Sequence, residues 1–125
     1  MDWTTYRALC DRGDVVSRWL LEHTVLLLEG AGEAELARRL RAVPESVPPL
    51  PRPADHRGGP EADFFAADLD AGTVAAVAAV VRRLAAEPER RLPGGRGLGG
   101  MSEAWGEYAA WLDGTHPRSP RRGDA

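Results

Sequence analysis

The strongest hydrophobic pattern in the chain is VVSRWLLEHTVLLLEG, between Asp14 and Gly30. Its apolar residues recur at helical spacing and cover a broad arc, whereas Arg18, Glu22 and Glu29 form a narrow charged strip. A helix that is apolar over most of its circumference packs against neighbours on several sides. Asp14 suits an N-cap and Gly30 a C-terminal stop. The sequence therefore predicts one helix over this stretch, at the centre of the fold.

The same spacing predicts further helices on both sides of this stretch. They cover residues 1–12, 31–41, 71–87 and 101–112. Asp70 is predicted to cap the third of these helices, with Thr73 three residues on. Segment 61–69, EADFFAADL, suits a short helix or a brief strand. We expect a helix, because alanine and acidic residues are poor strand formers and the sequence offers no partner strand. The chain is thus predicted to be all-α, a single small domain of about five helices around the central one.

Aromatic residues indicate which faces form the core. The stripe through Trp105, Tyr108 and Trp111 predicts the buried face of the last helix. We expect Trp3 and Trp19 to join the same core, which would pack the N-terminal and C-terminal helices together.

Two proline-rich segments interrupt the helical patterns. Val43 to Pro53 contains five prolines, which exclude a helix and a central strand, so we expect an extended connector across the surface. From residue 114 the chain reads GTHPRSPRRGDA, which is polar and predicts a disordered tail. The folded domain is therefore expected over residues 1–113, with the tail over 114–125.

Length and residue usage favour a cytoplasmic protein. The 125 residues match one domain, and the single cysteine, Cys10, excludes an internal disulfide and fits a reducing compartment. No apolar run approaches the ~20 residues that span a bilayer. The N-terminus lacks the basic and apolar regions of a signal peptide. We expect no membrane partner.

Charge argues against nucleic-acid binding. Arginine occurs 16 times, whereas lysine, asparagine, glutamine and isoleucine are absent, which indicates a GC-rich bacterial genome and reduces the functional weight of arginine clusters. The net charge is −3, and residues 1–113 hold 13 arginines against 18 acidic residues. Proteins that bind nucleic acid present a basic face, and this body is acidic.

A first candidate site is the loop PADHRGGP, in which Asp55, His56 and Arg57 precede Gly58 and Gly59. The glycines allow positive φ or close approach of another group, and loops on rigid scaffolds commonly carry sites. This pattern suggests acid–base or anion-binding chemistry. Asp55 can equally cap a turn. In an extended segment it also points away from His56, so it is not an obvious orienting partner for the imidazole.

A second candidate is the glycine-rich loop GGRGLGG before the last helix. It matches GxGxxG, but AEPERRLPG before it is not a strand, so we reject a dinucleotide-binding interpretation. Backbone amides at such a loop can bind an anion, with Arg96 as counter-charge and Gly97, Gly99 and Gly100 in the cradle. The alternative is that these glycines serve only tight turns and close packing.

His23 lies in the apolar arc of the predicted central helix. It is either a core histidine bonded to a carbonyl or water, or a neutral imidazole that serves as a base or ligand. The structural interpretation is favoured, because His23 has no partner within its own helix. One cysteine and three histidines show no zinc-ligand spacing, so we expect neither a metal site nor a cofactor.

These residues leave three hypotheses open. The first is a ligand-binding or regulatory module that holds a small anionic metabolite between the two loops. The second is a small cofactor-independent enzyme, with His56 or His23 as general base and Arg57 or Arg96 as charge stabilisers. The third is a protein–protein adaptor, as a homodimer or with another protein, whose contact surface is the proline-rich connector and the tryptophan face. We favour the first, because it requires least of the residues.

Overall fold

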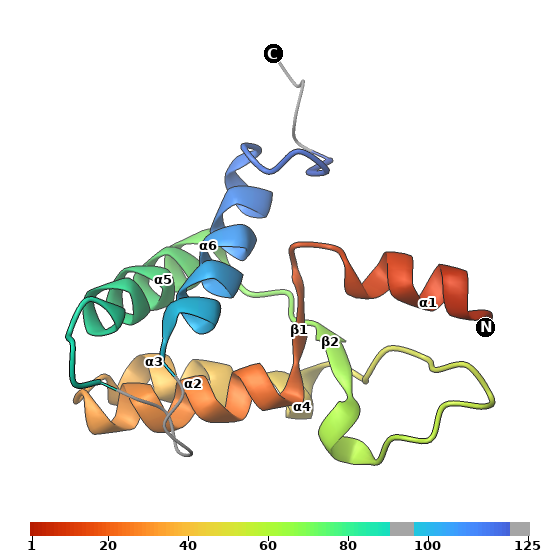
Figure 1. Cartoon of the computed structure of the whole chain (residues 1–125), viewed down its shortest axis with the longest axis horizontal. Helices are drawn as coiled ribbons and strands as arrows, with labels where there is room; N and C mark the ends of the chain where they lie inside the picture. Colours follow the sequence, from red (N-terminus) through yellow and green to blue (C-terminus); the bar gives the residue numbers. More distant parts are fainter. Residues whose placement is uncertain (91–96, 121–125) are drawn as a thin grey trace.

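The computed structural model describes residues 1–90 and 97–120 and is mostly helical (Figure 1). Helices α2 and α3 lie side by side, α5 packs on α6, and α1 lies apart at one end. The all-α prediction is confirmed in this coarse form, although a small two-stranded sheet is also present. The helices are α1 (Trp3–Cys10), α2 (Arg18–Gly30), α3 (Ala34–Arg41), α4 (Val43–Ser46), α5 (Ala71–Ala85) and α6 (Gly99–Asp113).

The sheet corrects two helix predictions. Strand β1 (Val15–Ser17) pairs antiparallel with β2 (Phe64–Ala66), which follows the 3-10 turn η1 (Pro60–Ala62). Val16 lies opposite Phe65, and both side chains are buried. A helix over 61–69 was therefore wrong. β-Branched and aromatic residues pack well across a strand pair, which explains why these two short segments meet.

Ser17 is the last residue of β1 and directly precedes α2. Its side-chain oxygen accepts a hydrogen bond from the Leu20 amide at 3.0 Å, so Ser17, and not Asp14, is the N-cap of the helix. The predicted helix was therefore too long at its N-terminus. Its C-terminal end at Gly30 agrees with the prediction.

The proline-rich connector contains one helical turn that was not expected. Pro44 lies in the first turn of α4, where a proline is tolerated because that amide has no partner within the helix. Beyond α4, the Leu50 amide donates to the Phe64 carbonyl at 2.8 Å. The exclusion of helix was thus wrong for Val43–Ser46.

The core lies between α2, α5 and α6 and contains buried polar contacts at Thr24. Trp105 Nε1 donates to Thr24 Oγ1 at 3.0 Å, and the Thr24 hydroxyl donates to the Leu20 carbonyl at 2.6 Å. Trp105 and Thr24 are fully buried. By contrast, Trp3 and Trp19 are 37% and 40% exposed, so the prediction that they join the core was wrong.

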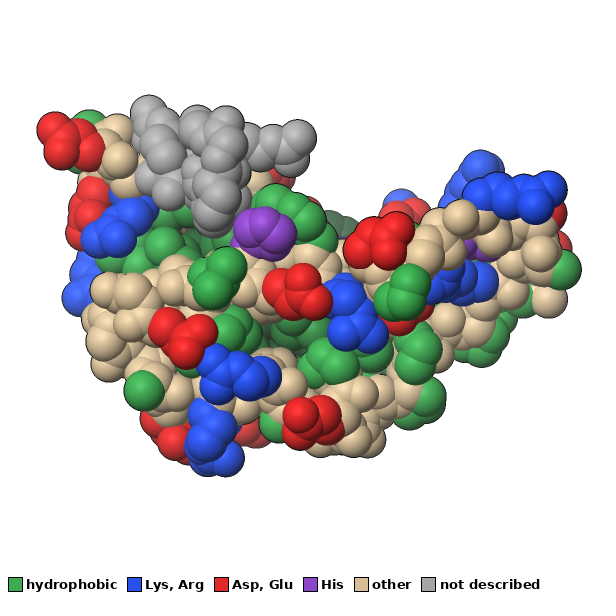
Figure 2. Space-filling view, turned by 90° about the horizontal axis from the view of Figure 1, so that it is seen from below, with side chains coloured by type: hydrophobic (Ala, Val, Ile, Leu, Met, Phe, Trp, Pro, Cys, Tyr) green, Lys and Arg blue, Asp and Glu red, His purple; other side chains and the backbone are tan. Residues whose placement is uncertain are grey.

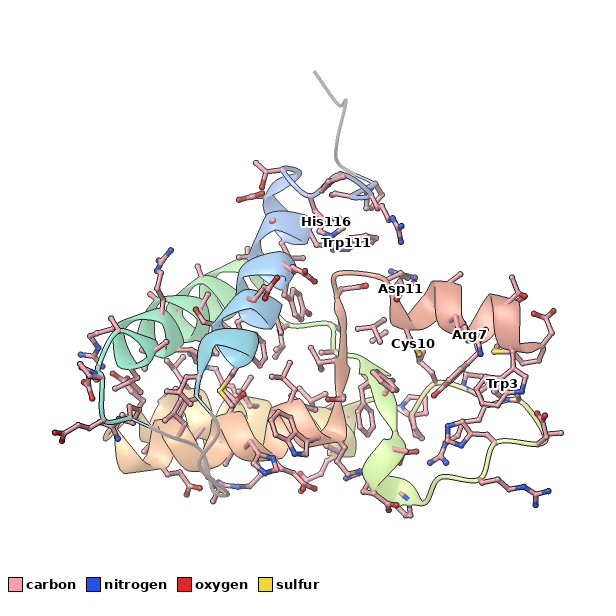
Figure 3. The ribbon with its side chains drawn as sticks, in the orientation of Figure 1. Trp3, Arg7, Cys10, Asp11, Trp111 and His116 are labelled. Atoms are coloured by element: carbon pink, nitrogen blue, oxygen red, sulfur yellow. The ribbon has the colours of Figure 1, made fainter. Side chains whose placement is uncertain are left out.

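The segment after α6 differs from the expected disordered tail. Gly114 ends the helix in the left-handed conformation, and the Ser119 hydroxyl then donates to the Trp111 carbonyl at 2.7 Å. Ser119 is 6% exposed, and His116 lies edge-on to the Trp111 ring (Figure 3). Residues 114–120 therefore pack against α6. The rest of the predicted tail, 121–125, lies outside the described residues.

Among residues 1–90 and 97–120, no helix combines the length and the apolar character needed to cross a membrane. The expected cytoplasmic location stays a prediction.

Candidate functional site

An ionic network ties the loop after the proline-rich connector to α2. The Asp63 carboxylate accepts one hydrogen bond from Arg52 and a second from Arg18 at 3.2 Å. Arg52 also donates to the Gly59 carbonyl at 2.8 Å. Burial alone would raise the pKa of the Asp63 carboxyl, but the two guanidinium groups outweigh it and hold this pKa below its ordinary value. The network fixes the course of residues 52–63.

His56 is held by the same loop. Its Nδ1 lies 3.0 Å from the Gly58 amide nitrogen and 3.2 Å from a guanidinium nitrogen of Arg52. Both partners are donors, so we assign Nδ1 as the acceptor and Nε2 as the protonated nitrogen. The imidazole also stacks on Trp3, with ring centroids 5.6 Å apart, and meets the edge of Tyr6 at 5.8 Å. His56 thus joins the loop to α1.

The other residues of the DHRGG sequence divide between structural and solvent-facing positions. Asp55 accepts a hydrogen bond from Trp3 Nε1 at 2.8 Å, which is a second link to α1. Gly58 is needed for close approach, because a Cβ there would lie 2.7 Å from His56 Cε1. Arg57 is exposed and forms no hydrogen bond or ion pair with the described residues. We call α1 with residues 51–63 the N-terminal arm.

Cys10 lies on the side of α1 that faces this loop (Figure 3), and Tyr6 of the same helix meets the His56 ring. The Tyr6 hydroxyl is buried without a hydrogen-bond partner among the described residues. Burial raises the pKa of the Tyr6 phenol, and the neighbouring Cys10 thiol adds to the shift. Burial also raises the pKa of Cys10. A raised thiol pKa lowers the thiolate population, so this cysteine is not activated as a nucleophile.

The second predicted site lies only partly within the described residues. Arg96 falls outside them, whereas Gly97 precedes α6 and Gly99 and Gly100 form its first turn. Gly100 lines a hollow of about 280 Å³ between α6 and β1, and the other lining residues are mainly apolar. No charged side chain of the described residues lines this hollow. Among the described residues, the geometry around Gly100 therefore offers an apolar contact and no charged side chain.

The loop of residues 54–59 and the described part of the glycine-rich loop, residues 97–100, occupy different regions of the molecule. Figure 1 places the loop of residues 54–59 at the end near α1, whereas α6 begins on the other side of the strand pair. The structure brings Asp55 and His56 together with α1, and it does not bring them to Gly97, Gly99 or Gly100.

His23 takes a structural contact on the outer side of α2. Its Nδ1 lies 2.8 Å from the Trp19 carbonyl oxygen, and its ring stacks on Trp19 with centroids 4.1 Å apart. Because a carbonyl only accepts, we assign Nδ1 as the protonated nitrogen. His23 and His56 are thus held separately, each within its own local structure.

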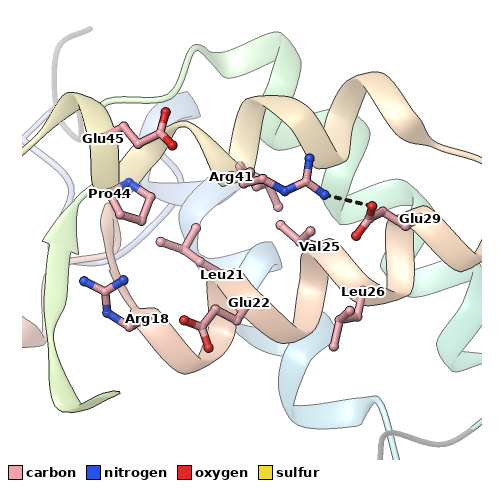
Figure 4. A pocket seen from close by; sticks show the side chains of 10 residues that line it. Arg18, Leu21, Glu22, Val25, Leu26, Glu29, Arg41, Pro44 and Glu45 are labelled. Atoms are coloured by element: carbon pink, nitrogen blue, oxygen red, sulfur yellow. Dashed lines mark ion pairs between the residues drawn. The ribbon is translucent and has the colours of Figure 1, made fainter. Parts of the chain in front are cut away.

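A groove that was not predicted runs between α2 and the α3–α4 segment (Figure 4). Its volume is about 580 Å³, within the range of ligand-binding clefts. We call it the α2–α4 groove. Leu21, Val25 and Leu40 are buried beneath it, whereas Leu26 on its wall is 59% exposed. It is lined by Arg18, Leu21, Glu22, Val25, Leu26, Glu29, Leu40, Arg41, Pro44 and Glu45.

Charged side chains surround this apolar floor, as Figure 2 shows for the face of the molecule below α2. At one end, Arg41 pairs with Glu29 at 2.8 Å. At the other, Glu22 and Glu45 lie on opposite sides of Leu21 and Pro44 (Figure 4). Both glutamates are exposed and form no ion pair within the described part of the chain. The groove therefore combines apolar contact area with carboxylates open to a ligand.

Sequence reasoning missed these groups for identifiable reasons. Arg18, Glu22 and Glu29 were assigned to a charged strip of α2, which is correct for the helix alone. Only the position of α3 and α4 turns that strip into the wall of a groove. Arg52 and Asp63 were missed because each lies in a segment with no periodic pattern.

Among residues 1–90 and 97–120, no three His, Cys, Asp or Glu side chains come close enough together to hold a metal ion. Comparisons of the chain with protein-family models, with curated proteins and with solved structures found no match.

Proposed function

We propose that the protein is a binding module whose ligand occupies the α2–α4 groove. The observation that carries the proposal is the groove itself, a hollow of about 580 Å³ with a buried aliphatic floor and an exposed aliphatic wall at Leu26. Ligand sites are concave and mostly apolar, with a few polar groups that fix orientation. Glu22 and Glu45 supply such groups. Helix α2 forms one wall of this site.

The histidine contacts favour binding over catalysis. A general base needs an accessible acceptor nitrogen within reach of the proton it removes. The acceptor nitrogen of His56 already faces two donors. His23 donates its Nδ1–H to a main-chain carbonyl and keeps Nε2 as an acceptor, so only its position argues against it. Neither histidine lines the groove. The proposal therefore assigns both imidazoles to structure.

An NMR titration tests the proposal. Amide shifts of the 15N-labelled chain would be followed with a panel of small organic cations, small organic anions, inorganic phosphate and amphipathic peptides. We expect at least one class to move the amides of α2, α3 and α4, because these elements line the groove. The Leu26→Ser variant should weaken these shifts and remain folded, since Leu26 is 59% exposed.

The same spectra can refute the groove. Shifts that phosphate induces only in residues 54–59 and 97–100 would support the anion site expected from the two loops instead. A panel that leaves the amides of α2, α3 and α4 unmoved would overturn the proposal.

A further inference from the structure

Some charged side chains of the α2–α4 groove are paired within the described part of the molecule, and others are not. Arg41 is paired with Glu29, and Arg18 donates to Asp63 and, at 2.9 Å, to the Pro60 carbonyl. Both guanidinium groups of the lining thus already have acceptors inside the molecule. Glu22 and Glu45 have no ion pair within the described residues. A ligand in this groove therefore meets uncompensated negative charge, which attracts a cation.

The shape of the groove is that of a cleft between two helices. A short turn with Gly32 at φ 80° joins α2 to α3, and the two helices pack along their length. The lining runs along α2 from Arg18 to Glu29, which corresponds to about 16 Å at 1.5 Å per residue. This length is about three helical turns. Grooves of this kind accept the apolar face of an amphipathic helix.

The apolar part of the lining extends well beyond the two free carboxylates. Val25 and Leu26 follow Glu22 by about one turn, toward the Arg41–Glu29 pair (Figure 4). A small cation between Glu22 and Glu45 would leave this half of the groove uncovered. A helical segment covers both halves, since it carries aliphatic and basic side chains on one face.

We propose that the groove docks a cationic amphipathic helix of a partner protein. This inference rests on the proposed function and adds the identity of the ligand class. About three turns of the partner lie along α2, with leucine-like side chains on Leu21, Val25 and Leu26. An arginine or lysine near one end of the partner helix lies between Glu22 and Glu45. The Arg41–Glu29 pair bounds the other end.

Two fluorescein-labelled synthetic peptides test the inference by anisotropy titration against the full chain. Both carry leucines at i, i+3, i+4 and i+7, and they differ only in having arginines or glutamates at the flanking positions. We expect the arginine peptide to bind at least tenfold more tightly. Glu22→Gln with Glu45→Gln should weaken it about fivefold, since exposed ion pairs are individually weak. The matched control, Glu103→Gln with Glu107→Gln on α6, should leave the affinity unchanged.

Leu26→Ser tests the apolar half separately and should weaken both peptides. Equal affinity for the two peptides would overturn the proposal of a cationic helix. The same holds if the Glu22 and Glu45 changes leave the affinity of the arginine peptide unchanged. Concentration-dependent self-association of the chain that Leu26→Ser removes would also overturn it, since this would indicate a second copy in the groove.

The test separates this inference from the proposed function. If only a small cation from the NMR panel moves the amides of α2, α3 and α4, the groove stands as a site and the docked helix is refuted. If nothing moves them, both are refuted together.

Discussion

The N-terminal arm and the α2–α4 groove both contain ionisable side chains, but the carboxylates of the arm are hydrogen-bonded and two carboxylates of the groove are not, within the described residues. In the arm, Asp55, His56 and Asp63 are each held by a donor from another segment or from the same loop. In the groove, Glu22 and Glu45 have no such partner among the described residues. The comparison shows that a dense run of ionisable residues, such as DHRGG, can serve mainly to shape its own loop. Chemical availability depends on what the fold leaves unpaired.

The largest expected effect is a loss of stability when the ionic network of the N-terminal arm is removed. Asp63→Ala should lower the free energy of unfolding by about 3 kcal/mol, because it leaves Arg18 and Arg52 partly buried without their shared acceptor. Urea unfolding followed by circular dichroism measures the loss. Asp55→Ala is the control in the same loop, and it should cost less because its contact with Trp3 is exposed. Equal losses in the two variants would show that the network is not what holds the arm.

The pH dependence of the same network gives the next effect. Because the folded-state pKa of Asp63 lies below its ordinary 3.8, its stabilisation is complete above that value and is lost as the pH falls through the folded pKa. At neutral pH, Asp63→Asn should be less stable than the natural chain by about 2 kcal/mol, since it replaces charge-assisted hydrogen bonds. The two stability curves should converge in acid. A constant gap down to pH 2 would contradict this role for the carboxylate.

A smaller effect separates two glycines that looked alike in the sequence. A Cβ on Gly58 would lie 2.7 Å from both His56 Cε1 and Ala62 Cβ, so Gly58→Ala should cost about 1 kcal/mol. Gly100→Ala meets no described atom within 4 Å and lies in the first turn of α6, so it should be neutral or slightly stabilising. Thermal unfolding of both variants measures the contrast. A destabilised Gly100→Ala would restore a conformational role to that loop.

The smallest effect concerns the groove. Glu22→Gln and Glu45→Gln should each change the free energy of unfolding by less than about 0.5 kcal/mol, because exposed side chains without partners contribute little to folding. Urea unfolding measures these free energies, and the Asp63 variants measured in parallel provide the comparison. A loss above 1 kcal/mol for either glutamate would place it in the structural network and weaken its assignment to a ligand.

The sequence predicted a helix well where its cap and its apolar period both lie within the same short segment. Asp70 and Thr73 illustrate this, since the Thr73 amide donates to the Asp70 carboxylate at 2.9 Å at the start of α5. The stripe of Trp105, Tyr108 and Trp111 likewise gave the buried face of α6. In such cases the cap and the period lie in the same segment as the helix they define.

Features that depend on distant segments could not be read in this way. Val15–Ser17 becomes a strand only because Phe64–Ala66 lies beside it, and neither segment indicates its partner. Arg52 has no periodic context, yet its guanidinium reaches Asp63. The groove is a property of the angle between helices, so no single stretch of sequence contains it.

Arg18 lies at the boundary of both regions, since it lines the groove and also binds Asp63. This shared residue would link the two regions thermodynamically for any ligand that competes with Asp63 for its guanidinium group. A ligand that draws the Arg18 guanidinium away from Asp63 weakens the attachment of the arm. By reciprocity, whatever tightens the arm lowers the affinity for such a ligand by the same factor. We expect this coupling only for a ligand that offers Arg18 an acceptor, because a cationic helix offers none and should leave the Arg18–Asp63 pair in place.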